Sequence, residues 1–154
     1  MQVSGLSAYY PLQLLLLHEV VEAGFGEAEP QVLVGAELGV DYIAVVACSI
    51  TGEIRFQSRL PYQHTNVETS VRQLADILCH TWKLMLSLNH HMLGLGVSVP
   101  GLVNALDGHV VDLPNIGWQN IDLIDMLHQR FVQQHMPEID ITIINDANAG
   151  ALSE

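Results

Sequence analysis

The chain has 154 residues, and 49% of them are hydrophobic, so it is long enough to bury one sizeable core and its size fits a single domain. Its formal net charge is -12, and its five basic residues are scattered along the sequence. A nucleic-acid backbone would be repelled by such a chain. We therefore do not expect these residues to bind DNA.

Residues 1–30 differ in character from the rest of the chain. Tyr9 to Ala23 has the length and apolar density of a helix, and Gly24 to Gly26 would end it. We predict a lead-in helix and linker here, although a tail packed on the domain surface fits the sequence equally well. The apolar run Leu14 to Leu17 is too short to span a membrane and follows no basic residue. No membrane contact is expected, and the protein is expected to be cytoplasmic.

From Gln31 onward the pattern becomes that of β-strands. Three segments have the pattern of strands, with bends at Gly39 and at Thr51-Gly52 between them: Val32 to Leu38, Tyr42 to Ser49 and Glu53 to Leu60. Three consecutive strands with such short connections predict an antiparallel meander.

A helix and a buried strand are expected next. Apolar residues recur at steps of three and four between Asn66 and roughly His91, with Asn66 as a plausible N-cap. Leu93 to Val99 is almost entirely apolar or glycine, which suits a central strand covered on both faces. The segment Leu102 to Leu113 then predicts a hairpin, because it carries Asp107-Gly108 between apolar flanks.

The remaining elements complete an α/β pattern. Asp122 to Gln134 reads as a second helix, Ile139 to Ile144 as another buried strand, and Ala147 to Glu154 as the start of a helix. We expect a mixed, partly antiparallel sheet flanked by helices. The strands at residues 93–99 and 139–144 are expected to lie centrally in it.

Asn145 and Asp146 are the strongest candidates for chemistry. They follow a buried strand and begin a helix, which is where open α/β sheets usually bind ligands. A carboxylate there could accept a proton from a hydroxyl group that attacks a phosphoryl group. The alternative is that Asp146 only caps the following helix, and the residues by themselves favour the cap.

Three motifs together resemble the ROK family, whose name stands for repressors, open reading frames and kinases of sugars. They are the segment 141–154 with its Asn-Asp pair, the Ser-Val-Pro-Gly segment 98–101, and the Pro-Asn-Ile-Gly-Trp segment 114–118. The resemblance runs from about Val32 to Glu154. It implies the N-terminal lobe of an actin-like ATPase (ribonuclease H-like) fold at residues 31–154, with the second lobe absent. Within the family, the chain is most similar to the sugar-sensing domain of regulators of the N-acetylglucosamine-repressor type.

The resemblance also implies roles for individual residues. In the kinases of the family the aspartate matching Asp146 is the catalytic base, and the asparagine matching Asn145 binds the sugar. The segments matching Gly101 and Asn115 line the hexose cleft, and Asn115 is the better candidate for direct contact. Trp118 is interpreted as a core residue.

The phosphate side departs from the pattern of the family's kinases, which have a turn of the Asp-x-Gly-Gly-Thr type. Glu37 and Gly39 match cofactor-binding positions of that turn, but Val40 replaces a glycine and Asp41 replaces the hydroxyl residue. The added negative charge would repel an anionic ligand. ATP and Mg²⁺ are therefore expected only if the protein is a kinase, and no cofactor is expected otherwise.

No metal site is expected, because Cys48, Cys79 and the His residues lack metal-ligand spacing. Both cysteines are expected to be reduced core residues, and the histidines are expected to be solvated.

The preferred function is a sugar or phosphosugar effector-binding lobe of a ROK-type transcriptional regulator, which would contact DNA only through a segment outside these residues. A ROK sugar kinase acting on a hexose or N-acetylhexosamine is the alternative, and a protein-interaction domain that keeps only the fold is a third. Formation of a homo-oligomer is left open.

Overall fold

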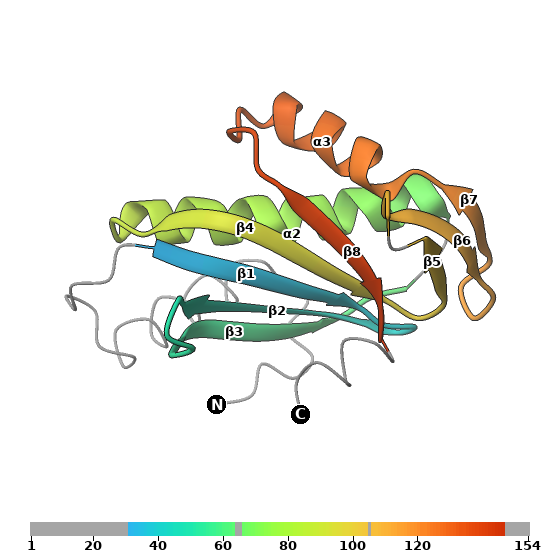
Figure 1. Ribbon diagram of the computed structural model, residues 1–154, viewed down its shortest axis with the longest axis horizontal. Coiled ribbons are helices and arrows are strands. Elements are labelled where there is room, and N and C mark those ends of the chain that lie inside the picture. Colours follow the sequence, from blue (N-terminus) through green and yellow to red (C-terminus); the bar gives the residue numbers. More distant parts are fainter. Residues whose placement is uncertain (1–30, 64–65, 105, 147–154) are drawn as a thin grey trace.

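The computed structural model describes residues 31–63, 66–104 and 106–146 (Figure 1). They form a five-stranded sheet with the order β3-β2-β1-β4-β8 and a three-stranded sheet with the order β5-β6-β7. The predicted lead-in helix and linker at 1–30, and the helix predicted from Ala147, lie outside the described residues. In the part of the chain that is described, no helix is long and apolar enough to cross a membrane.

The predicted meander is confirmed. The strands β1 (Gln31–Leu38), β2 (Tyr42–Ser49) and β3 (Ile54–Pro61) pair antiparallel in that order. Alternate residues of β1 and β2 are buried, as expected for strands with one face on a core. The tight turn between β1 and β2 places Gly39 and Tyr42 at the end of the sheet where β1 finishes.

Helix α2 (Val67–Ser87) follows the meander. Asn66 caps it as predicted, because its side-chain oxygen accepts a hydrogen bond from the Thr69 N–H at 2.8 Å. The expectation that the helix continues to about His91 is wrong. Asn89 adopts a left-handed backbone conformation (φ 62°), which ends the helix and turns the chain into β4.

Strands β4 (His91–Val99) and β8 (Ile141–Asn145) extend the sheet in parallel with β1. The expected central position of the strand at 93–99 is confirmed, because β4 lies between β1 and β8. The expected central position of the strand at 139–144 is wrong, because β8 lies at the edge of the five-stranded sheet in the described part of the chain. Its Thr142 is exposed and only Ile143 is fully buried. The apolar run indicated a buried strand, but burial does not specify neighbours on both sides.

The smaller sheet contains β5 (Leu102–Asn104), β6 (His109–Leu113) and β7 (Trp118–Ile121). The β5–β6 hairpin is confirmed, and Gly108 takes the positive φ of 72° that its turn requires. Strand β7 was not predicted. The final helix, α3 (Leu123–Gln133), begins at its cap Asp122, whose side-chain oxygen accepts a hydrogen bond from the Asp125 N–H.

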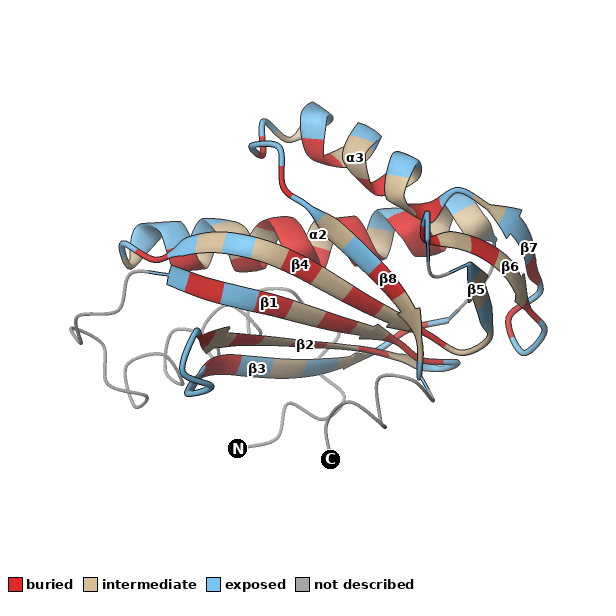
Figure 2. Cartoon of the chain, viewed as in Figure 1, coloured by how far each residue is buried: buried red, intermediate tan, exposed pale blue. Residues whose placement is uncertain are grey.

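One continuous core joins the helices to the larger sheet (Figure 2). The largest fully buried side chains include Trp118 and Phe131, which lie at opposite ends of the segment formed by β7 and α3. Trp118 is therefore a core residue, as interpreted. Cys79 is buried and Cys48 is half-buried, and both are free thiols. The expectation of solvated histidines is wrong for His90, which is 5% exposed because the turn after α2 folds it inward.

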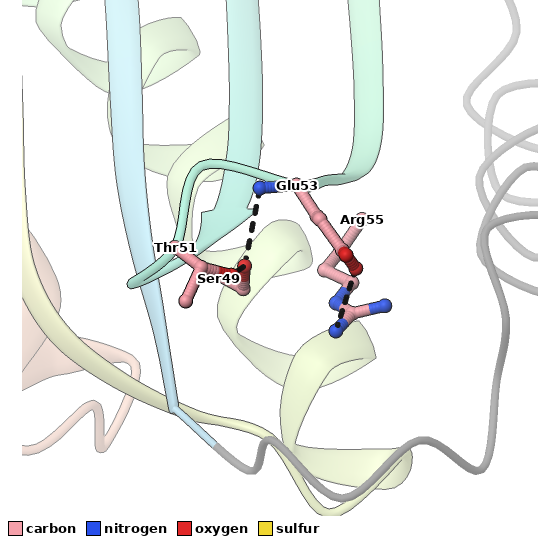
Figure 3. A network of polar contacts seen from close by, with 4 residues as sticks. All are labelled: Ser49, Thr51, Glu53 and Arg55. Atoms are coloured by element: carbon pink, nitrogen blue, oxygen red, sulfur yellow. Dashed lines mark hydrogen bonds and ion pairs between the residues drawn. The ribbon is translucent and has the colours of Figure 1, made fainter.

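A polar network at the other end of the sheet holds the β2–β3 turn (Figure 3). The Ser49 hydroxyl accepts a hydrogen bond from the Glu53 N–H at 3.1 Å and lies 2.9 Å from the Thr51 hydroxyl. Buried Arg55 pairs with exposed Glu53 at 3.4 Å. An ion pair with one exposed partner contributes little to stability, so we assign this network a local structural role.

Candidate functional site

The carboxyl ends of three parallel strands meet at one end of the larger sheet (Figure 1). The register pairs Glu37 of β1 with Ser98 of β4, and Val99 of β4 with Asn145 of β8. The residues that follow these strands therefore emerge at the same edge. This is the edge at which open α/β sheets carry their ligand sites.

Asn145 is the last residue of β8 and is half-buried, whereas Asp146 directly after it is exposed. The register of β8 with β4, and of β4 with β1, brings Asp146 to the same edge of the sheet as the turn that follows β1. Whether Asp146 also caps a helix depends on residues beyond 146, which lie outside the described part.

Gly101 lies against strand β6. A Cβ atom at Gly101 would lie 2.4 Å from the backbone oxygen of Asp112 and 2.6 Å from the Cδ2 atom of Leu113. Leu113 leads into the turn that holds Asn115, and its carbonyl oxygen accepts a hydrogen bond from the Gly117 N–H at 2.9 Å. Gly101 is therefore packed beside the start of this turn, and Asn115 is exposed on it.

The turn after β1 is filled by its own residues. The Gly39 N–H donates a hydrogen bond to the Tyr42 carbonyl oxygen at 2.9 Å. A Cβ at Gly39 would lie 2.4, 2.6 and 2.7 Å from three atoms of the Tyr42 ring, and these similar distances place the ring face over the glycine. The Tyr42 hydroxyl donates a hydrogen bond to the Glu37 carboxylate. The guanidinium of Arg59 lies 3.7 Å from the centre of the ring.

Tyr42 was not among the predicted residues of this site. The available signal was a large aromatic side chain three residues after a glycine in a tight turn, but only the folded structure shows that the ring lies on that glycine.

Charge at this end of the sheet is mainly negative. The hydrogen bond to Glu37 is the main reason that the pKa of Tyr42 is raised, followed by burial and the Glu37 charge. Arg59 opposes this shift and Asp146 adds to it. Tyr42 therefore remains a neutral phenol at physiological pH. In the described residues, no group of three His, Cys, Asp or Glu side chains is placed to hold a metal ion.

Comparison with known proteins identifies the family. The model of the ROK family matches residues 33–154, which is most of the chain. The chain belongs to the ROK family. The predicted family and the predicted α/β actin-like fold are thereby confirmed, and solved ROK structures share the arrangement of strands and helices.

Among ROK relatives, a xylose repressor from Caldicellulosiruptor bescii is 32% identical over 152 residues, covering 88% of this chain and 36% of the repressor. A solved ROK family transcriptional regulator, a homologue of the E. coli MLC protein, superposes with a TM-score of 0.70 at 16% identity over 90% of this chain and 38% of its own. A ROK hexokinase from Thermus thermophilus gives 0.63 at 22% identity, over 80% and 38% of the two chains. The chain thus spans about a third of the length of the curated relatives it matches.

The structure brings most of the predicted site residues of this ROK chain to one end of the sheet. Glu37, Gly39, Gly101 and Asn145-Asp146 all lie at or just after the ends of the parallel strands. Asn115 lies on the neighbouring turn. Their roles in binding remain predictions.

Proposed function

We propose that this chain is the N-terminal, effector-binding lobe of a ROK-type transcriptional regulator and that it binds a sugar at the ends of β1, β4 and β8. The observation that carries the proposal is the turn after β1, where the Tyr42 ring lies on Gly39 and the Tyr42 hydroxyl engages Glu37. A kinase needs this turn open for nucleotide phosphates. The similarity to a xylose repressor supports the same reading.

The sugar contacts are assigned to groups that suit a ligand made mainly of hydroxyls. The amide side chains of Asn115 and Asn145 can both donate and accept hydrogen bonds, and the Asp146 carboxylate can accept them. Gly101 brings backbone to the edge of the site without a side chain in the way. In a regulator, Asp146 would hold a sugar hydroxyl by a hydrogen bond and would take part in no phosphoryl transfer.

DNA binding belongs to a segment outside these residues in this proposal. The net charge of -12 would repel a phosphate backbone from the lobe. The lobe would instead report sugar occupancy to a DNA-binding part of the protein. A relative named xylose repressor and a solved ROK family transcriptional regulator support this separation of sugar binding from DNA binding.

The second candidate is a ROK sugar kinase. The fold shared with the Thermus thermophilus hexokinase supports it, as does an aspartate at the position of Asp146. In that case Asp146 would be the general base that accepts the proton of the attacking sugar hydroxyl. ATP with Mg²⁺ would have to displace the Tyr42 ring from Gly39.

A coupled phosphotransfer assay separates the two candidates. A full-length protein that carries these residues is incubated with Mg-ATP and a panel of hexoses, pentoses and N-acetylhexosamines, with Asp146→Asn as the matched control. The regulator reading predicts sugar binding by calorimetry and no turnover that depends on Asp146. Turnover that is lost in Asp146→Asn would establish the kinase instead.

A further inference from the structure

We propose that the sugar site selects an uncharged sugar over its phosphorylated form, and that Tyr42 is the specificity-determining residue because it closes the turn after β1 to anions. This inference rests on the proposed sugar-binding function and narrows the class of effector. It follows from how the turn uses its own hydrogen-bonding groups and from the charges around it.

The glycine N–H of the turn is already engaged within the turn. Backbone N–H groups in a glycine-containing turn bind phosphate only when they point at the ligand. Here the Gly39 N–H donates to the Tyr42 carbonyl oxygen at 2.9 Å. The Tyr42 ring covers the side of Gly39 on which a Cβ would stand, since a Cβ there would already lie 2.4 Å from the ring. Gly39 itself is buried.

The charges at this end of the sheet also oppose a phosphate group. Glu37, Asp41 and Asp146 are all carboxylates at or beside the strand ends. Arg59 is a cation at this end, and its guanidinium already stacks on the Tyr42 ring at 3.7 Å from the ring centre. A phosphate dianion near these carboxylates would therefore meet several like charges. A neutral sugar meets no such cost.

Paired titrations of the 154-residue chain test the preference directly. We would compare D-glucose with D-glucose 6-phosphate, and D-xylose with D-xylose 5-phosphate, by following backbone amide signals in ¹⁵N NMR spectra. The neutral sugar of a pair should bind at least about tenfold more tightly than its phosphate. Equal or tighter binding of the phosphosugar would overturn the inference.

A charge-removal series tests the electrostatic part. In the double variant Glu37→Gln/Asp41→Asn, the ratio of neutral-sugar affinity to phosphosugar affinity should fall about tenfold, because two nearby charges are lost with little change of shape. The matched control is Glu138→Gln/Asp140→Asn, which removes the same charge at the other end of β8. The same change of ratio in both double variants would contradict a local effect.

A third titration isolates the ring and does not depend on sugar binding. Tripolyphosphate with Mg²⁺ should not shift the Gly39, Val40 and Asp41 amides of the wild-type chain, and saturable shifts there would refute a closed turn. In the Glu37→Gln/Asp41→Asn background, Tyr42→Ala should expose Gly39 and produce such shifts, whereas Tyr42→Phe keeps the ring and should not. Identical behaviour of the Ala and Phe variants would overturn the role of Tyr42.

Failure of the proposed sugar-binding function can be told apart from failure of the proposed role of Tyr42. Binding of neither sugar in any pair would refute the proposed function, and with it the preference for a neutral sugar. The tripolyphosphate series would still decide whether Tyr42 closes the turn. Dispersed amide spectra for each variant establish that the fold is intact.

Discussion

Replacing Gly101 with alanine tests the close approach between the end of β4 and strand β6. The added Cβ would lie 2.4 Å from the Asp112 carbonyl oxygen, 2.6 Å from the Leu113 Cδ2 atom and 3.0 Å from the Leu113 Cα atom. Two of these three contacts are with backbone, which cannot move aside without disturbing β6. Overpacking of this kind costs about 1–3 kcal/mol. We expect Gly101→Ala to destabilise the chain by that amount.

Urea unfolding followed by circular dichroism measures this loss. With a slope of about 2 kcal/mol per M, a loss of about 2 kcal/mol lowers the unfolding midpoint by roughly 1 M. The matched control is Gly96→Ala, on the same strand. A Cβ there meets nothing within 4 Å, so this variant should unfold within about 0.3 M of the wild type or slightly later.

Equal unfolding midpoints for Gly101→Ala and Gly96→Ala would contradict the close approach of Gly101 to β6. That result would mean that the β4–β5 turn does not press against β6 and that Gly101 is not held beside the Asn115 turn. Gly101 would then no longer be supported as part of the proposed sugar site.

Trp118, Cys79 and Tyr42 each allow a test of the structure. Trp118→Ala should destabilise the chain by about 3–5 kcal/mol in urea unfolding, because Trp118 is only 2% exposed, and a small loss would place its ring outside the core. Burial raises the pKa of the Cys79 thiol to about 11. A disulfide reagent at pH 8 should therefore modify Cys48 quickly and Cys79 only after unfolding. Fast modification of both cysteines in the folded chain would contradict this. The hydrogen bond to Glu37 raises the pKa of Tyr42, so it stabilises the fold below pH 10, and this contribution should be lost as the pH rises through the folded-state pKa. Tyr42→Phe should lose less stability than the wild type over that pH range. Identical profiles of stability against pH for the two proteins would argue against the Glu37 hydrogen bond.

Sequence patterns predicted the elements whose order depends on local signals. The meander, the start of α2 at Asn66 and the hairpin at Asp107-Gly108 each rest on periodicity, a cap or a turn residue within a few positions. The end of α2 was misplaced because the apolar spacing continues past Ser87, and only the left-handed backbone of Asn89 stops it. Strand β7 was missed because four residues after a Pro-Asn turn carry too weak an alternation.

Tertiary relationships were harder to predict. The edge position of β8 depends on which strands pair, which apolar content does not encode. Family motifs predicted the candidate site residues Gly101, Asn115, Asn145 and Asp146, and their roles stay predictions. Tyr42 matches no motif, since its importance arises from the contact of its ring with Gly39 and of its hydroxyl with Glu37.

A map of sugar binding on the 154-residue chain would show whether the proposed sugar site exists. Titration with D-xylose, followed by ¹⁵N NMR, should shift the amides of Gly101, Asn115, Asn145 and Asp146 in one saturable process, and Asn145→Ala should weaken all of the shifts together. Saturable shifts confined to other surfaces, or shifts that survive unchanged in Asn145→Ala, would contradict a sugar site at the ends of β1, β4 and β8.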